Sequence, residues 1–282
     1  MPAGTATVVL ALVAAIAWGA GDFGGGLTSR KTAVFGVVLL SQLTGMAISL
    51  ALATIRAEAI PGPVDLGWSL LAGILGAIGI TALYRGLALG RMGIVAPVTG
   101  VLAAVIPVAA GILLEGVPPP LVLFGIAIAI GSVVLVSRVA DDEGGRAGLS
   151  EALIAGVAIG LFGVVIAQIT DGLVFGPLSV VRGVQAVLLA VLILATGTAW
   201  RPAARLLPII ALIGILDMTG NAMYFFAVQT GLLAVAAVIS SLYPVTTVIL
   251  ATIVLGERVS RDHAVGIALA VVAVACIGVG SA

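Results

Sequence analysis

A carboxylate lies inside a long apolar stretch of the sequence, at Asp217. Asn221 follows four residues later and Tyr224 three residues after that, so a helix places the three side chains on or near one face. An ionisable group in an apolar segment costs free energy and is a candidate for function by default. Asp217 could carry a proton, or it could hydrogen-bond a neighbouring helix as a neutral side chain.

A second carboxylate, Asp22, lies in the glycine-rich segment Trp18–Gly26. Gly21 and Gly25 form a GxxxG pair, which lets two helices approach closely, and these glycines also permit an unwound turn beside a bound solute. Trp18 is one helical turn before Asp22 and belongs to the same candidate site. The alternative for Asp22 is a position near a helix end, where its side chain reaches water.

Two arginines also fall inside apolar segments. Arg85 follows Tyr84 and could pair with Asp22, bind an anionic group, or extend its long side chain to the membrane surface. Arg182 lies within the first third of its segment, with Gln185 about one turn away, and its side chain could instead reach the membrane boundary near Gly176. The predicted substrate- or ion-binding residues are Trp18, Asp22, Tyr84, Arg85, Arg182, Asp217, Asn221 and Tyr224.

Other residues inside the apolar segments are expected to shape helix packing. Gln42 and Gln168 are expected to bridge neighbouring helices. Pro97, Pro107 and Pro244 lack a backbone N–H and free carbonyl groups that a neighbouring helix or a solute must satisfy. These prolines fit either simple kinks or helices that bend during gating.

The sequence offers few groups for enzyme chemistry. Its one histidine is His263, and it lacks a pair of zinc-binding histidines, a Gly-x-Ser-x-Gly elbow and a phosphate-binding loop. The acidic run Asp141–Glu143 is expected to be a solvated loop rather than a metal site. We expect no metal and no cofactor. A membrane enzyme that acts on a lipid-linked substrate through Asp22 or Asp217 is kept as an alternative.

The composition indicates an integral membrane protein. Of the 282 residues, 62% are apolar and 9% are charged, whereas soluble domains average about 25% charged residues. So few charges cannot cover the surface of a soluble fold, but an apolar exterior suits a lipid bilayer. The formal net charge is zero, which gives no indication of a nucleic-acid partner.

Ten apolar segments predict an all-α protein with ten transmembrane helices, because each is near the roughly 20 residues that a span requires. Clusters of charge, proline and glycine separate them. The predicted helices cover residues 5–27, 33–55, 65–89, 92–114, 121–137, 149–170, 176–198, 206–229, 232–255 and 262–280.

The chain is predicted to consist of two five-helix repeats, at residues 1–138 and 149–282, joined by a polar linker at 139–148. Gly125–Ala129 and Gly266–Ala270 have similar sequences, and they are 141 positions apart, half the chain. An odd number of spans in each half places the second half in the opposite orientation. Such inverted repeats are common in secondary transporters, whose binding sites lie between the halves.

The basic residues of the connections predict an orientation in the cell membrane. Nine of the ten Lys and Arg residues outside the predicted helices fall in odd-numbered connections, and only Arg56 falls in an even-numbered one. Basic residues in short loops favour the cytoplasmic side. This bias predicts a multi-pass protein with both termini outside the cell.

Several motifs in the second half resemble those of one transporter family. They are Tyr224–Ala227, Ser240–Thr246, which ends in Tyr-Pro-Val-Thr, and Leu255–Arg258 with the sequence Leu-Gly-Glu-Arg. Trp18-Gly19 followed by Phe23 is similar to the opening helix of the same family, and Leu114-Glu115-Gly116 stands where Leu-Gly-Glu is expected. Across nearly its whole length the chain therefore resembles the EamA type of the drug/metabolite transporter superfamily.

This resemblance implies two inverted five-helix repeats around a central cavity, and secondary transport of a small metabolite or drug. Family members often export their solutes and are commonly described as proton-coupled. The resemblance also implies cytoplasmic termini, which is the reverse of the charge prediction. The expected partners are a small-molecule solute, the lipid bilayer and protons, with the protein a monomer or a homodimer. A scaffold that transports nothing is the remaining alternative, and it predicts a filled interior.

Overall fold

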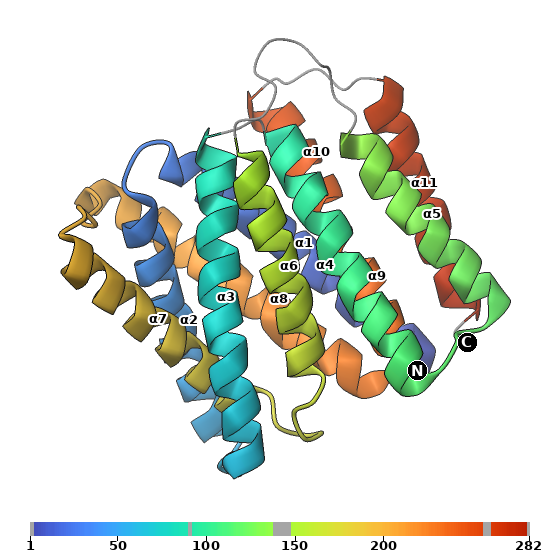
Figure 1. Ribbon diagram of the computed structural model, residues 1–282, viewed down its shortest axis with the longest axis horizontal. Helices are drawn as coiled ribbons and strands as arrows, with labels where there is room; N and C mark the ends of the chain where they lie inside the picture. The colour runs from blue at the N-terminus through green and yellow to red at the C-terminus, as the bar shows by residue number, and fades with distance from the viewer. Residues whose placement is uncertain (1–2, 90–91, 138–147, 256–260, 281–282) are drawn as a thin grey trace.

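The computed structural model describes residues 3–89, 92–137, 148–255 and 261–280, and every regular element among them is a helix (Figure 1). The predicted linker at 139–148, apart from its last residue, lies outside these residues, as does the acidic run Asp141–Glu143. The helices are α1 (Ala3–Ser29), α2 (Val34–Ile55), α3 (Pro63–Leu89), α4 (Met92–Glu115), α5 (Pro120–Ser137), α6 (Leu149–Ile166), α7 (Phe175–Thr196), the short 3₁₀ helix η1 (Ala204–Leu206), α8 (Leu207–Thr230), α9 (Leu233–Ser240), α10 (Tyr243–Leu255) and α11 (Arg261–Gly280).

Within the described residues, eight helices are long and apolar enough to cross a membrane, with α9 and α10 counted together as the span Leu233–Leu255. The described apolar part of α5, Pro120–Ser132, is shorter. The fold is therefore that of a helical membrane protein. The count of ten spans goes beyond this finding and stays a prediction.

The break between α9 and α10 differs from the predicted continuous helix at 232–255. Pro244 follows directly after the break and has no N–H to donate to a carbonyl one turn earlier. Ser240 and Ser241 instead donate their hydroxyls to the carbonyls of Ala237 and Val238 at 3.1 and 2.7 Å. In contrast, α4 runs without a break through both of its prolines.

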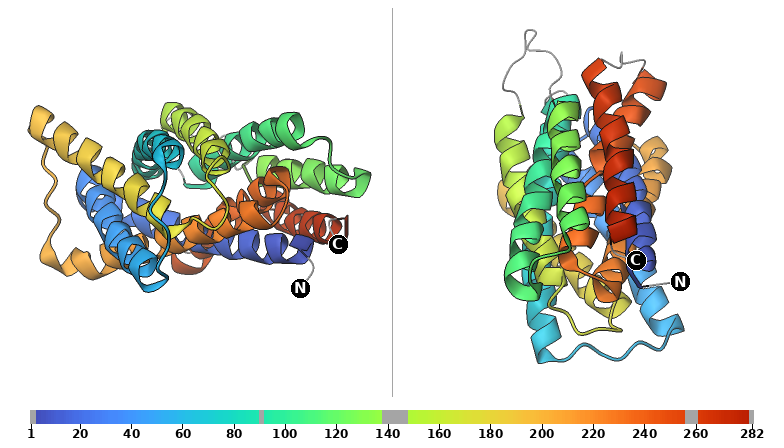
Figure 2. Two further views of the ribbon diagram at one scale, coloured as in Figure 1. Left: turned by 90° about the horizontal axis from the view of Figure 1, so that it is seen from below. Right: turned by 90° about the vertical axis from the view of Figure 1, so that its right-hand side faces the viewer.

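Helices from the two halves pack against one another in a reciprocal pattern. Extensive contacts join α1 with α8, α3 with α6, α2 with α7, and α5 with α11. In order along the chain, α1, α2, α3 and α5 of the first half correspond to α6, α7, α8 and α11 of the second half. When each helix is replaced by its counterpart, the α1–α8 pair becomes the α6–α3 pair, and the α2–α7 and α5–α11 pairs stay the same. In Figure 1, α5 and α11 lie side by side and run in opposite directions, and Figure 2 shows the same pairing from two other sides.

Glycines let the helices of these pairs come close together. A Cβ atom at Gly220 of α8 would overlap the indole ring of Trp18 on α1, and one at Gly79 of α3 would lie 2.8 Å from Ile159 of α6. Gly79 and Gly220 are 141 positions apart, and so are Trp18 and Ile159. The two helix pairs therefore share one contact, in which a large side chain of one helix covers a glycine of the other.

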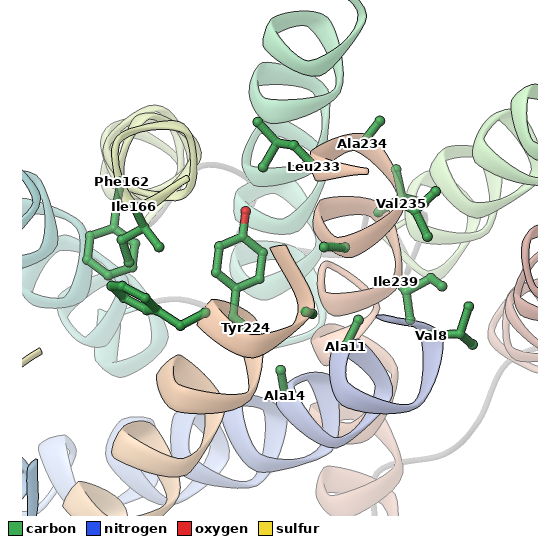
Figure 3. Packing of buried hydrophobic residues seen from close by; sticks show 14 of the residues in the cluster. Val8, Ala11, Ala14, Phe162, Ile166, Tyr224, Leu233, Ala234, Val235 and Ile239 are labelled. Carbon is green, nitrogen blue, oxygen red and sulfur yellow. The ribbon is translucent and has the colours of Figure 1, made fainter. Parts of the chain in front are cut away.

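The apolar residues divide between a packed interior and an apolar exterior. Figure 3 shows one interior cluster, in which Tyr224 lies between Phe162 and Ile166 of α6 and the residues of α9. On the outside, Leu113 and Leu194 are 85% and 82% exposed. A water-soluble protein does not expose so many large apolar side chains, whereas a lipid bilayer covers them.

Three carboxylates of the first half bind backbone groups of the second half. Glu58 accepts hydrogen bonds from the N–H groups of Val174 and Gly176 at the start of α7, at 3.2 and 2.7 Å. Asp65 accepts from the N–H of Thr170 at 2.9 Å, and Glu115 accepts from that of Leu233 at 2.9 Å. Because the first N–H groups of a helix have no partner within it, Glu58 and Glu115 act as helix caps between the halves.

Candidate functional site

A cavity of about 80 Å³ lies between the two halves, and α1, α3, α4, α6, α7, α8, α9 and α10 all contribute to its walls. This volume accommodates several waters or a small solute. Six of the eight predicted site residues line it: Trp18, Asp22, Arg182, Asp217, Asn221 and Tyr224. The cavity therefore brings together side chains that are far apart in the sequence.

Asp217 forms a buried ion pair with Arg182, which the sequence did not pair with it. The Nη1 atom of Arg182 donates to Oδ2 of Asp217 at 2.5 Å, and the two residues are 2% and 8% exposed. The side-chain amide of Asn221 donates to Oδ1 of Asp217 at 3.1 Å. Nη1 also donates to the amide oxygens of Gln42 and Gln185. The network joins side chains of α2, α7 and α8, and within it the carboxylate of Asp217 accepts from Arg182 and Asn221.

Asp22 differs from Asp217 in its partners. Its side chain is 7% exposed and lines the same cavity. α1 continues to Ser29, so Asp22 lies within the helix rather than at an end that reaches water. Among the described residues, none donates a hydrogen bond to its carboxylate, and Asp217, a group of like charge, is the charged residue that acts on it. A buried carboxylate without a partner must bind a proton or a cation.

Tyr84 and Arg85 are the two predicted site residues that do not line the cavity. Tyr84 is buried against Gly25 of α1, where a Cβ atom would overlap the phenol ring. Arg85 is exposed, and no ion pair joins it to Asp22 among the described residues. Successive residues of a helix point about 100° apart, so when Tyr84 faces the interior, Arg85 faces outward.

The two glutamines behave differently from each other. Gln42 of α2 accepts a hydrogen bond from Arg182 of α7 and so bridges two helices, as the sequence predicts. Gln168 is exposed, and its amide donates to the carbonyl of Val164 one turn earlier at 3.4 Å, so it does not bridge helices. Gln168 follows the end of α6, where carbonyls lack partners within the helix, and this explains its local bond.

Three further residues line the cavity at the break between α9 and α10, namely Ser240, Ser241 and Tyr243, and none of them was among the predicted site residues. The break directs this short segment, with its hydroxyl groups, into the cavity. Pro244 and the family motif that contains it were the available signals, but neither indicates which side chains point inward.

The two walls of the cavity differ in chemistry although their positions correspond. Residues 141 positions apart face the cavity together, and in each such pair the side chain on α1 or α8 is the more polar or the more aromatic. The pairs are Trp18 and Ile159, Asp22 and Gly163, Asp217 and Gly76, Asn221 and Ile80, and Tyr224 and Leu83. The α1–α8 wall is polar and charged, and the α3–α6 wall is apolar.

Within the described part of the chain, no cluster of histidine, cysteine, aspartate or glutamate side chains is arranged to hold a metal ion. The charged groups among the described residues of the site are two carboxylates, a type of group that can take up and release a proton, and one guanidinium group, which stays charged.

Comparisons with known proteins show similarity to a family of transporters. The model of the EamA-like transporter family matches residues 5–138 and 146–279, one match in each half of the chain. A solved structure described as "Crystal structure of protein" has a TM-score of 0.74 and 18% sequence identity, and the alignment covers 96% of this chain and 95% of that one. At this identity the likeness concerns the fold alone. No curated protein matches the chain.

Proposed function

This chain belongs to the EamA-like transporter family, and from this premise we propose that it is a secondary transporter whose cavity carries one small solute at a time. The observation that supports the proposal is a polar cavity between two halves of an otherwise apolar protein. Sites of this kind, between repeats, are typical of transporters that alternate access between the two sides of a membrane. A scaffold would need no such cavity.

We propose ten spans arranged as two inverted repeats, at residues 1–138 and 149–282. The reciprocal packing of α1 with α8 and of α3 with α6 supports this arrangement, as do the opposite directions of α5 and α11 in Figure 1. In this scheme α9 and α10 form one broken span. Discontinuous helices beside the binding site are a recurring feature of secondary transporters.

We propose that Asp22, rather than Asp217, exchanges protons during transport. Asp217 is bound to Arg182 and Asn221, so its protonation would break an ion pair and leave a buried guanidinium group unpaired. Asp22 has no such partner among the described residues and faces the cavity directly. A proton that enters as a solute leaves would make the protein an exporter.

We also propose that the termini face the outside of the cell. Both ends of the chain lie on one side of the molecule in Figure 1. The end of α1, which Arg30 and Lys31 follow in the sequence, lies on the opposite side, and so does the connection between α7 and α8, which contains Arg201 and Arg205. Basic loops favour the cytoplasm. Protease access to a tag fused to the N-terminus, measured in intact cells, tests this orientation.

Solute-driven proton movement in proteoliposomes tests the transport proposal. The purified protein is reconstituted with a pH-sensitive dye inside the vesicles, and members of a panel of small metabolites are added outside one at a time. We expect at least one solute to change the internal pH in the wild type and not in Asp22→Asn. Asp65→Asn is a matched control, because Asp65 is a buried carboxylate outside the cavity.

Two results would contradict the proposal. A wild type that responds to no member of the panel argues against transport itself. If Asp22→Asn keeps the wild-type rate of solute-driven proton movement, transport stands but the role of Asp22 does not.

A further inference from the structure

The charged groups of the cavity do not balance. With both carboxylates ionised, the cavity wall carries Asp22 and Asp217 against the single cation Arg182. Arg182 is already paired with Asp217. One negative charge, on Asp22, therefore has no opposite charge among the described residues of the wall.

The guanidinium group of Arg182 keeps its unpaired nitrogen atoms away from the cavity surface. Its Nη1 atom already donates to Asp217, Gln42 and Gln185. Its Nε and Nη2 atoms are buried without a hydrogen-bond partner in the described structure, so they do not form part of the cavity surface. A Cβ atom at Gly45 of α2 would lie 3.3 Å from Nε, so this edge faces α2. An anionic group in the cavity would therefore meet the unpaired carboxylate of Asp22, whereas the cation of Arg182 is already paired with Asp217.

The opposite wall has no polar side chain to compete for a charged group. Ile80 and Leu83 of α3 and Ile159 and Phe162 of α6 present apolar side chains to the cavity. Such a wall can pack against an apolar body, but it offers no hydrogen-bond or ion-pair partner to a second charged or strongly polar group. The aromatic rings of Trp18 and Tyr243 line the cavity as well and suit a cation through their ring faces.

We propose that the cavity selects monovalent organic cations with an apolar body, such as amines, with the cationic group on Asp22 and the body against the α3–α6 wall. This inference rests on the proposed transport function and names the chemical class of its solute. It also gives Asp22 two competing occupants, a proton and the cationic group of the solute, because one carboxylate cannot hold both.

A matched series of four probes tests this selectivity on the purified full-length protein in detergent. The probes share a phenylethyl-type body and differ in charge: 2-phenylethylamine is a cation, phenylalanine a zwitterion, 3-phenylpropionate an anion and 2-phenylethanol neutral. Binding is measured by titration calorimetry at neutral pH for the wild type, for Asp22→Asn and for the control Asp65→Asn.

We expect the amine to bind the wild type at least about tenfold more tightly than the zwitterion and the anion, because only the amine places a cation on a desolvated carboxylate without adding a repelled charge. Asp22→Asn should lose this preference and keep its affinity for 2-phenylethanol, which shows that the variant is folded. Asp65→Asn should keep the wild-type order of affinities.

Three results would overturn the proposal: tighter binding of the anion or the zwitterion, equal binding of all four probes, or no saturable binding of the amine. An unchanged preference for the amine in Asp22→Asn would overturn the assignment of Asp22. These outcomes differ from a failure of transport, because a protein that binds an anion and moves it across vesicles would keep the transport function and lose only the cation selectivity.

Discussion

The α1–α8 pair and the α3–α6 pair occupy corresponding places in the two halves, yet they give the cavity opposite walls. Both pairs keep the same glycine contact, Trp18 over Gly220 in one and Ile159 over Gly79 in the other. Where they face the cavity, however, Asp22 corresponds to Gly163. Packing between helices is therefore shared by the repeats, whereas binding chemistry is concentrated on one wall.

The difference has a physical reason. A carboxylate within a membrane is costly, and each one added requires a partner or a function. Asp217 has its partner in Arg182 of α7. At the position that corresponds to Asp217 on the other wall, Gly76, the amide of Gln185 fills the space where a Cβ atom would lie. The apolar wall therefore cannot take a carboxylate at that position without displacing Gln185.

The largest expected effect comes from removing Arg182, the cation that pairs with Asp217 of the polar wall. Arg182→Met leaves Asp217 buried without its partner and should cost about 3–5 kcal/mol of stability. The double variant Arg182→Met with Asp217→Leu removes both charges and should recover most of this loss. Thermal unfolding in detergent measures both. A double variant no more stable than Arg182→Met would contradict an ion pair between these residues.

The shared glycine contact predicts a smaller loss of stability in both pairs. Gly220→Ala drives a methyl group into the rigid indole of Trp18, and Gly79→Ala drives one against the flexible side chain of Ile159. Each should cost roughly 1–3 kcal/mol, with Gly220→Ala the more costly because a ring cannot bend away.

Gly67→Ala is the matched control for these two variants, because nothing lies within 4 Å of a Cβ atom there. It should leave the melting temperature unchanged or raise it, since alanine favours a helix. If Gly220→Ala and Gly79→Ala melted like Gly67→Ala, the close contact that we describe in the two pairs would be wrong.

Shortening a side chain on the apolar wall should weaken binding of the solute without changing the preference for its charge. Leu83→Ala removes apolar contact with the body of a bound solute and should weaken 2-phenylethylamine binding by about 1 kcal/mol, roughly fivefold. The preference for the amine over 3-phenylpropionate should persist, because Asp22 is untouched. A reversed charge preference in this variant would show that the two walls do not act separately.

The smallest effect is expected at the predicted site residue that faces outward. Arg85 is exposed and outside the cavity, so Arg85→Gln should change stability by no more than about 0.5 kcal/mol. Probe binding should equal that of the wild type. A loss of binding as large as that of Asp22→Asn would place Arg85 in the site after all.

The sequence predicted a helical membrane protein and the three charged residues of the cavity, because charged and aromatic side chains stand out within apolar segments. Trp18, Asp22, Arg182 and Asp217 were found in this way, and all four line the cavity. The orientation of Arg85 could not be found, because periodicity does not fix how a helix is rotated when apolar residues surround it on all sides.

The pairing of Arg182 with Asp217 was also beyond the sequence. It depends on how α7 and α8 pack with α2, and no spacing along the chain encodes that arrangement. The break before Pro244 goes beyond the kink expected there, because a proline within an apolar segment does not indicate whether the helix bends or ends. Only the packed structure shows that the serines there bind backbone carbonyls.

Infrared difference spectroscopy of purified protein, with and without 2-phenylethylamine, tests the central claim most directly. This claim is that Asp22 is the free carboxylate of the cavity and Asp217 the paired one. We predict that the bound amine removes a protonated-carboxyl band in the wild type, that the band is absent from Asp22→Asn, and that it persists in Asp217→Asn. A protonated-carboxyl band that is absent from Asp217→Asn and present in Asp22→Asn would contradict this assignment of the two carboxylates.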